Sequence, residues 1–475
     1  MKQVKPEDIL DAVGMVDDEL IRQAKEGKKK LFFRRSAFLP VLAAVLVLSL
    51  GLGLFFGRGR LFLHAYAVAE AEYPTMCPHP EENSRSYDKE FEAWRNSKEE
   101  QLSGYDKSMA ADGFFAESIR EFLSERPGEN CVYSPVNVYM ALSMLAELTE
   151  GTSRAQIMGL LGISDIETLR KNASAVWNAC YCDDGWLTSV LANSLWLNQD
   201  IRFHKETLET LAETYYASSY CGKMGSGSFD KALREWLDQQ TGGGLRDSIE
   251  GLHLERPTLL SLVSTVFFEA EWWNAFQKEK TEQGIFYAPA GEVSCDFMSQ
   301  KEDDTYYWGE RFSAVQKGLR GGCKMWFILP DEGMTPEELL SEPQTMEFLL
   351  SNGVWENKKD LSVRLVVPKF DISSETDLIE GLKNLGVTEI FDGRTADFSP
   401  LIRDTGEERI SGAQHVVRVQ IDEKGCSAVA YSKFDLTKDG PPLKDNIDFI
   451  VNRPFLFVIT SEAGLPLFTG IVNTP

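Results

Sequence analysis

The last sixty residues constrain the fold of this chain more than any other part of it. A strand-like run ends at Gly425, and a segment of small residues follows it over positions 426–432. A polar stretch around Lys438 and a closing hydrophobic block complete the chain. Side chains of an extended segment alternate between two faces, so this order predicts a strand whose continuation can enter a sheet.

The alternation divides the side chains after Gly425 into two unlike faces. With Cys426 as the first inward residue, the inward face is small at first and apolar at its end, whereas the outward face is largely polar. The inward set is Cys426, Ala428, Ala430, Ser432, Phe434 and Leu436, and the outward set is Ser427, Val429, Tyr431, Lys433, Asp435 and Thr437. The segment lacks proline, which would delete a ladder hydrogen bond. The segment could therefore enter a sheet with its small face on a tightly packed core and its polar face towards water. The simpler alternative is an ordinary edge strand.

Two stretches of this region resemble one protein family closely. Residues 422–432, DEKGCSAVAYS, resemble the hinge of a serpin reactive loop, and residues 449–459, FIVNRPFLFVI, resemble the serpin signature that follows it. The ending PLFTGIVNTP is also similar to that of serpins. The resemblance implies an α+β fold with a large central mixed β-sheet, two further sheets, about eight or nine helices and an exposed reactive loop. It also implies a single-use protease inhibitor that is not itself an enzyme.

Eight further short runs follow the serpin order from Tyr105 to the C-terminus. None is specific alone, but their shared order is strong evidence for the resemblance. They include YSPVN (133–137), GTSRAQ (151–156), ANSLWL (192–197), TGGG (241–244), LVSTVFF (262–268), FILPDE (327–332), VPKF (367–370) and LGVTEIF (385–391). Within the first run, Ser134 as N-cap and Pro135 at the first helical position predict a helix start independently of the family.

The net charge of the chain is −24, and it is distributed unevenly. Residues 1–60 carry 11 basic and 7 acidic side chains, which leaves a net charge of −28 on residues 61–475. So acidic a remainder disfavours binding of nucleic acid or of an anionic membrane surface by the main domain. It favours solubility and an encounter with basic proteases.

A run of 22 residues without a charge, positions 36–57, follows a basic cluster. A helix of this length covers roughly 30 Å, the thickness of a bilayer's hydrocarbon core. The excess of Lys and Arg before the run places the N-terminus in the cytoplasm by the positive-inside rule. The predicted organisation is a cytoplasmic stub (1–35), a transmembrane helix (36–57), an extracellular tether (58–104) and a serpin domain (105–475), as in a membrane-anchored, bacterial-type serpin.

The N-terminal region allows an alternative to the anchor and contains a predicted tether. Ala65-Tyr66-Ala67 is a small-x-small site, so a cleaved signal peptide and a secreted protein are the alternative to an anchor. Proline, asparagine, serine and many charges in residues 58–104 predict a flexible tether, with a helix expected near residues 87–98.

The sequence offers no cofactor or metal site. Eight cysteines are too sparse for a disulfide scaffold, and Cys180-Tyr181-Cys182 lacks the spacing and partners of a zinc site. The chain has only five histidines and no Gly-x-Ser-x-Gly, His-Glu-x-x-His or phosphate-loop motif. We therefore expect a monomer that acts without a cofactor, whose partner is a serine protease.

The serpin resemblance implies two sites that control opening of the large sheet. The polar shutter beneath the sheet maps to Ser134, Asn137, Ser264 and His415. Serpins commonly carry serine at the position of Asn137 and asparagine at that of Ser264, and we expect this exchange to preserve the number of hydrogen bonds in the shutter. The breach, where insertion begins, maps to Trp272 near the hinge residues Glu423, Gly425 and Cys426. Glycine at 425 allows the backbone angles of a pivot.

The cleaved bond follows from counting along the loop. Sixteen residues on from Glu423 is Asp439, whereas counting back from the Pro441-Pro442 pair gives Lys438. We favour the bond Lys438–Asp439, because lysine suits trypsin-like proteases, with Asp439–Gly440 as the alternative. The implied mechanism is suicide inhibition by acyl-enzyme formation and loop insertion.

A non-inhibitory serpin is the main alternative function. Such a protein would act as a binding module or as a substrate that is cut without trapping. Tyr431, where a small residue is usual, and a lengthened loop before Asn452 favour it, although the outward parity of Tyr431 reduces the weight of that residue. A surface adhesin is a third class.

Overall fold

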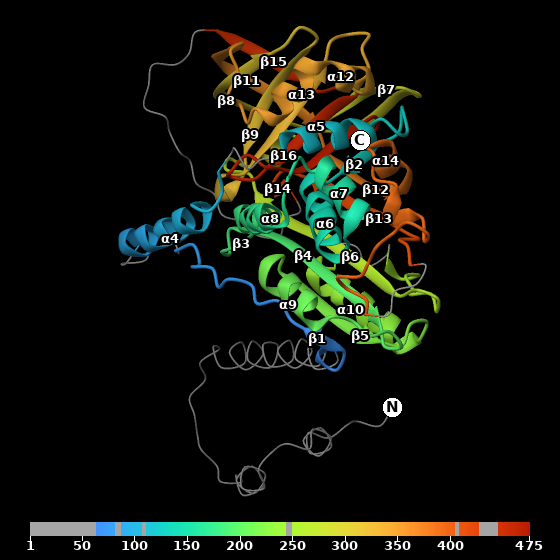
Figure 1. The fold of residues 1–475 in the computed structure, drawn as a ribbon. Helices are drawn as coiled ribbons and strands as arrows, with labels where there is room; N and C mark the ends of the chain where they lie inside the picture. Colours follow the sequence, from blue (N-terminus) through green and yellow to red (C-terminus); the bar gives the residue numbers. More distant parts are fainter. Residues whose placement is uncertain (1–62, 81–86, 107–110, 244–248, 404–407, 427–444) are drawn as a thin grey trace, which may run out of the picture. The chain divides into compact units, whose positions relative to one another are not determined.

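The computed structural model describes residues 63–80, 87–106, 111–243, 249–403, 408–426 and 445–475 (Figure 1). They belong to one compact unit, Phe62–Pro475, of the predicted α+β class. Two large mixed sheets and the helices around them build this unit.

The first sheet has the strand order β1-β5-β4-β6-β14-β13-β12, with β3 beside β4. Its neighbours are antiparallel except β4 and β5, which are parallel. The strands are β1 (Ala67–Ala69), β3 (Cys182–Asp183), β4 (Leu187–Asn198), β5 (Ala217–Gly222), β6 (Leu260–Glu271), β12 (Phe370–Asp377), β13 (Gln414–Ile421) and β14 (Gly425–Cys426).

The second sheet has the order β15-β11-β8-β9-β10-β16-β17-β2, with β7 on β8. The two further sheets implied by the resemblance are joined here into one, because β8 runs for 18 residues and pairs first with β7 and then with β11 and β9. The strands are β2 (Cys131–Tyr133), β7 (Glu282–Ala288), β8 (Gly291–Trp308), β9 (Phe312–Gly318), β10 (Lys324–Pro330), β11 (Lys358–Pro368), β15 (Asn446–Ile450), β16 (Phe455–Thr460) and β17 (Pro466–Val472).

The described ranges contain ten α-helices, slightly more than the eight or nine expected. They are α4 (Tyr87–Leu102), α5 (Asp112–Leu123), α6 (Pro135–Leu148), α7 (Gly151–Leu160), α8 (Ile166–Cys180), α9 (Lys205–Thr214), α10 (Gly227–Gln240), α12 (Pro336–Ser341), α13 (Pro343–Leu350) and α14 (Leu378–Asn384).

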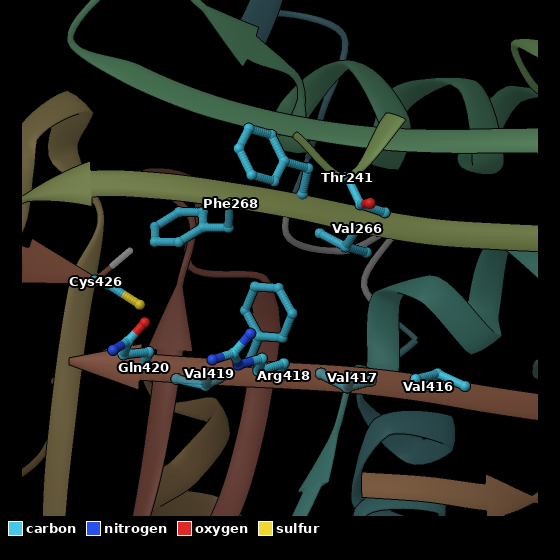
Figure 2. A pocket seen from close by; sticks show the side chains of 11 residues that line it. Thr241, Val266, Phe268, Val416, Val417, Arg418, Val419, Gln420 and Cys426 are labelled. Carbon is cyan, nitrogen blue, oxygen red and sulfur yellow. The ribbon is translucent and has the colours of Figure 1, made fainter. Parts of the chain in front are cut away.

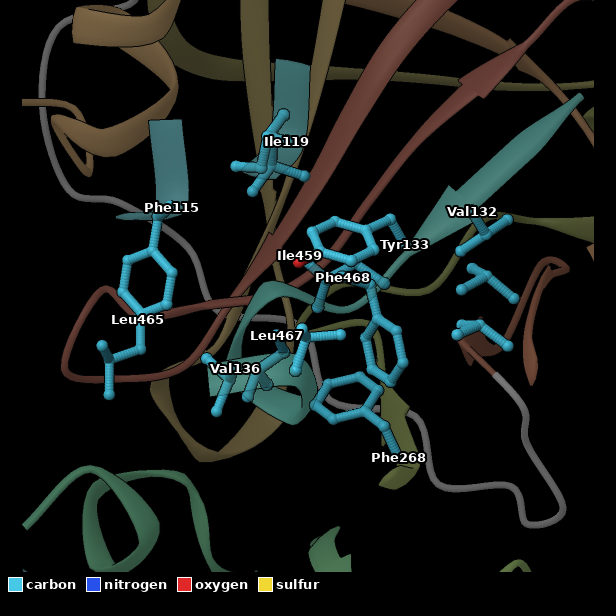
Figure 3. Close-up of a cluster of buried hydrophobic side chains, with 14 of the residues drawn as sticks. Phe115, Ile119, Val132, Tyr133, Val136, Phe268, Ile459, Leu465, Leu467 and Phe468 are labelled. Atoms are coloured by element: carbon cyan, nitrogen blue, oxygen red, sulfur yellow. The ribbon is translucent and has the colours of Figure 1, made fainter. Parts of the chain in front are cut away.

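Helix α6 is buried between the sheets because nearly all of its side chains are apolar. Its start follows the predicted pattern: the Ser134 hydroxyl accepts a hydrogen bond from the Asn137 amide at 3.4 Å, and Pro135 occupies the first turn. Apolar side chains from α5, β2, α6, β6 and β17 meet around this helix start (Figure 3). Labelled members of this cluster are Phe115, Ile119, Tyr133, Val136, Phe268, Leu467 and Phe468.

The segment predicted to be a tether packs on the domain over its described part. We call residues 63–80 and 87–102 the N-terminal strap. Strand β1 extends the first sheet at β5, and Leu63 is buried against the aromatic cluster around Trp196. Farther along, the Tyr73 ring lies 5.2 Å from the Trp177 ring, and helix α4 continues beyond the expected residue 98 to Leu102. The described residues of the predicted tether therefore pack on the domain that was predicted to begin at residue 105.

The N-terminal predictions fall outside the described residues. These are the cytoplasmic stub, residues 1–35, and the charge-free run, residues 36–57. Of the helices that the structure does describe, none has the length and apolar character needed to cross a bilayer.

Candidate functional site

The first sheet contains an interval between β6 and β13 that is filled only at one end. Strand β6 pairs with β4 from Leu260 to Ala270, and β13 pairs with β12 along its whole length. Between them the described chain supplies only the two residues of β14, whose Cys426 pairs with Ala270 of β6 and with Ile421 of β13. Among the residues that the structure describes, nothing else pairs with the facing edges of β6 and β13 beyond β14, an arrangement that favours addition of a strand.

A cavity of about 130 Å³ lies in this interval, directly beyond β14 (Figure 2). Val266 and Phe268 of β6 line one side, and Val417 and Val419 of β13 line the other. Cys426 lies at its end and is 3% exposed, so its side chain is inward, which is the parity that the face analysis assumed. Thr241, Arg418 and Gln420 line the cavity together with these apolar side chains, and its small volume suits small side chains entering from β14.

Trp272 holds the turn that leads into β14. Its indole Nε1–H donates to the Asp422 carbonyl at 2.8 Å, and its amide donates to the Lys424 carbonyl at 2.8 Å. The ring is 1% exposed and packs edge-to-face with Phe276, whose amide donates to the Glu423 carbonyl at 2.9 Å. The predicted breach residue thus binds the backbone of the hinge at several points.

Gly425 is required by close packing. A Cβ at this position would collide with the Ala270 carbonyl oxygen and would lie 2.8 Å from the Glu271 Cα. Its φ is not in the left-handed region, so the expected role as a pivot with unusual backbone angles is not what fixes glycine here. The absence of a side chain lets the hinge approach β6 closely enough to pair.

Glu423 is anchored by charge as well as by its backbone. Its carboxylate receives the Lys369 ammonium at 2.7 Å and the Thr281 hydroxyl at 2.9 Å, and its side chain is almost fully buried. Burial raises the pKa of Glu423, but the hydrogen bonds from Lys369, from its own backbone and from Thr281 outweigh burial and hold the pKa below its usual range. The sequence analysis singled out the run VPKF that contains Lys369, but it did not identify the ion pair between Lys369 and Glu423, which lies 54 positions later.

The structure brings together three of the four predicted shutter residues. The Ser134 amide donates to Nε2 of His415 at 3.1 Å, and the Ser134 hydroxyl donates to the Leu467 carbonyl at 2.6 Å. Because Nε2 is the acceptor, the imidazole is neutral with its proton on Nδ1. Burial lowers the pKa of His415 to about 4, which keeps the ring uncharged at neutral pH. Asn137 contributes its backbone amide to the Ser134 hydroxyl.

Ser264 has a partner that the sequence did not identify. Its hydroxyl donates to Oδ1 of Asn193 on β4 at 2.7 Å, and the Asn193 amide group donates to the Tyr215 carbonyl at 3.2 Å. The exchange of serine and asparagine therefore does not place Ser264 and Asn137 in one hydrogen bond. The available signal was the polar pair Asn193-Ser194 between apolar residues in the middle of β4, because polar side chains in a buried strand need hydrogen-bond partners.

The remaining loop positions lie outside the described residues. These are the hinge residues Ser427, Ala428, Val429, Ala430, Tyr431 and Ser432 and the bond positions Lys438, Asp439 and Gly440. All eight cysteines are described and are free thiols, and the described residues contain no cluster of three potential metal ligands.

Comparisons with known proteins agree with this geometry. Residues 109–475 match the family described as Serpin (serine protease inhibitor). The chain is 27% identical to wheat Serpin-Z1C (Triticum aestivum) over 392 residues, covering 78% of this chain and 96% of the wheat protein. It is also 27% identical to alpha-1-antiproteinase F of Cavia porcellus, covering 76% of this chain and 89% of that protein.

Solved structures show the same fold. The native structure of the thermophilic serpin tengpin superposes with a TM-score of 0.69 at 26% identity, covering 78% of this chain and 95% of tengpin. Thyroxine-binding globulin in complex with thyroxine superposes with a TM-score of 0.67 at 23% identity, covering 78% and 100% of the two chains. The protein therefore belongs to the serpin family of serine protease inhibitors and is not an enzyme.

Proposed function

We propose that this serpin traps serine proteases by inserting its cleaved reactive loop between β6 and β13. The observation that carries the proposal is the interval itself: a two-residue strand is seated at one end, and no other described residue pairs with the strand edges beyond it. A native state that leaves these edges unpaired stores free energy that one more strand would release.

The seated residues fix the register of the proposed insertion. Gly425 pairs with Glu271, and Cys426 pairs with Ala270, so continued antiparallel pairing would set Ala428 opposite Phe268 and Ser432 opposite Ser264. The edge of β6 reaches Leu260, which leaves room for ten more residues, through position 436. The small inward residues would then enter the cavity beyond β14.

The distance and free energy suit a trap. The 13 residues from Cys426 to Lys438 span roughly 43 Å when extended, at about 3.3 Å each. Pairing ten further residues contributes on the order of 10 kcal/mol, at about 1 kcal/mol per hydrogen bond. A protease held as an acyl-enzyme at Lys438 would be displaced by the length of the domain, and its active site, which tolerates only about 1 Å of misplacement, would be distorted before water could release it.

The proposed target class is a trypsin-like protease. Lys438 supplies the basic side chain that an acidic specificity pocket binds, and cleavage of Lys438–Asp439 would free the loop for insertion. Cleavage at Asp439–Gly440 is the alternative.

The deciding experiment mixes the full-length protein with trypsin at equimolar concentration. An SDS-stable adduct, with mass spectrometry locating the cut after Lys438, supports the trap, as does a cleaved form that melts at a higher temperature than the intact form. Clean cleavage without an adduct and without a change in melting temperature favours a non-inhibitory serpin. A Lys438→Ala variant tests the bond: it should lose the adduct with trypsin.

We also propose that residues 36–57 anchor this inhibitor in a cell membrane with the serpin domain outside. The charge-free run and the basic cluster before it support the proposal. Fractionation tests it: the protein should stay with membranes at high pH, and external protease should digest the domain. A secreted, shortened protein would refute it.

A further inference from the structure

The N-terminal strap reaches the end of β6 at which the hinge is seated. His79, 8% exposed, stacks on the indole of Trp186 with ring centroids 3.2 Å apart and an interplanar angle of 15°. The Arg320 guanidinium lies 4.2 Å from the centre of the same indole. Two groups so near one ring centre cannot share a face, so His79 and Arg320 enclose Trp186 from opposite sides.

Arg320 connects this stack to the hinge. It lies between β9 and β10 of the second sheet, is 7% exposed, and forms an ion pair with Glu271 at 3.1 Å. Glu271 is the last residue of β6, and it pairs with Gly425. A continuous row of contacts therefore runs from His79 in the strap through Trp186 and Arg320 to the position where β14 begins.

Further contacts fix the strap at this place. The His79 amide donates to the Asp184 carbonyl at 2.8 Å, and Nε1–H of Trp94 donates to the Asp184 carboxylate at 3.0 Å. The same carboxylate accepts the amide of Trp186, which sets the indole beside His79. Lys98 of α4 forms an ion pair with Glu462 at 3.2 Å, in the turn between β16 and β17. The strap thus joins the start of β4 to the second sheet.

We infer that the stack of His79, Trp186 and Arg320 positions Glu271 so that the hinge stays seated, and that the strap thereby sets the rate of loop insertion. This inference rests on the proposed trap. Two paired residues give a weak seat, since each hydrogen bond contributes only about 1 kcal/mol. Insertion competes with hydrolysis of the acyl-enzyme, so a seat that loosens diverts the inhibitor from trapping to simple cleavage.

The test compares two variants that each remove one buried strap side chain from the full-length protein. His79→Ala breaks the stack, and Leu63→Ala, a residue 6% exposed at the opposite end of the strap, is the control. The readout is the ratio of SDS-stable adduct to cleaved, free inhibitor after reaction with trypsin, with the melting temperature measured alongside. His79→Ala should lower this ratio about five- to tenfold, because a desolvated stacking contact of this kind changes a rate by that factor. Leu63→Ala should lower the melting temperature and leave the ratio within about twofold of the wild type.

Two further variants separate positioning from folding. His79→Phe keeps a flat ring on Trp186 and should restore the ratio, whereas Arg320→Gln breaks the same row from the other side and should lower it. Equal ratios for His79→Ala and Leu63→Ala, or failure of His79→Phe to restore the ratio, would overturn the inference while leaving the trap intact. A wild-type protein that forms no adduct would instead refute the trap, and the inference with it.

Discussion

Replacement of Gly425 by alanine tests whether seating of the hinge limits trapping. The added methyl group would meet the Ala270 carbonyl and the Glu271 Cα, both backbone atoms of β6 that cannot rotate away. Overpacking of this kind costs about 1–3 kcal/mol, which is at least as large as the contribution of one or two hydrogen bonds of β14 at about 1 kcal/mol each. The substituted hinge should therefore leave its seat. If reseating becomes part of the insertion barrier, a cost of about 1.4 kcal/mol slows insertion about tenfold.

The assay is the ratio of adduct to cleaved inhibitor with trypsin, and Gly159→Ala is the matched control. Gly159 lies in helix α7 with open space where a Cβ would stand, so alanine there should leave the ratio unchanged and slightly stabilise the helix. A Gly425→Ala protein that traps as efficiently as the wild type would show that the two-residue seat does not limit insertion.

Three other predictions concern the residues around the interval. Burial lowers the pKa of His415 to about 4, so below about pH 6.5 the unfolded chain binds a proton at this imidazole while the folded chain does not. The free energy of unfolding should therefore fall by up to about 3 kcal/mol between pH 6.5 and 4. Urea unfolding at several pH values checks this, and His415→Asn should remove this contribution to the pH dependence. Lys369→Met leaves the buried Glu423 carboxylate without its ion-pair partner and should lower the free energy of unfolding by about 2–3 kcal/mol in the same measurement. The double variant Lys369→Met, Glu423→Gln should regain part of this loss, because it no longer buries an unpaired charge. A double-mutant cycle on Asn193→Ala and Ser264→Ala should give a coupling energy of about 1 kcal/mol, and a value near zero would mean that their hydrogen bond contributes nothing to holding β4 against β6.

The sequence predicted the parts of this structure that depend on local pattern. A serine followed by proline marked the start of α6, and the Cys426 side chain has the inward parity that the face analysis assumed. Both signals arise within a few residues of the feature they determine. The α+β class and the family followed from the order of many such short patterns.

Features that depend on contacts between distant segments could not be predicted in this way. The strap has the composition of a linker, and its packing becomes evident only when Tyr73 meets Trp177 and His79 meets Trp186, about one hundred positions later in each case. The need for glycine at 425 likewise comes from the backbone of β6, which no pattern around the hinge reveals. Hydrophobic periodicity and capping patterns depend only on residues near one another in the sequence, whereas these contacts form only in the tertiary structure.

Because the packed strap starts early in the sequence, it shortens the linker between the proposed membrane anchor and the folded domain. If residues 58–104 were free, the domain could reach far from the bilayer, but Leu63 is already part of a buried cluster. Only residues 58–62 then separate the charge-free run from the folded domain, a contour length of at most about 18 Å at roughly 3.5 Å per residue. If the proposed anchor exists, an inhibitor held this close to the bilayer would encounter proteases that act at the cell surface in preference to those that diffuse through the surrounding medium.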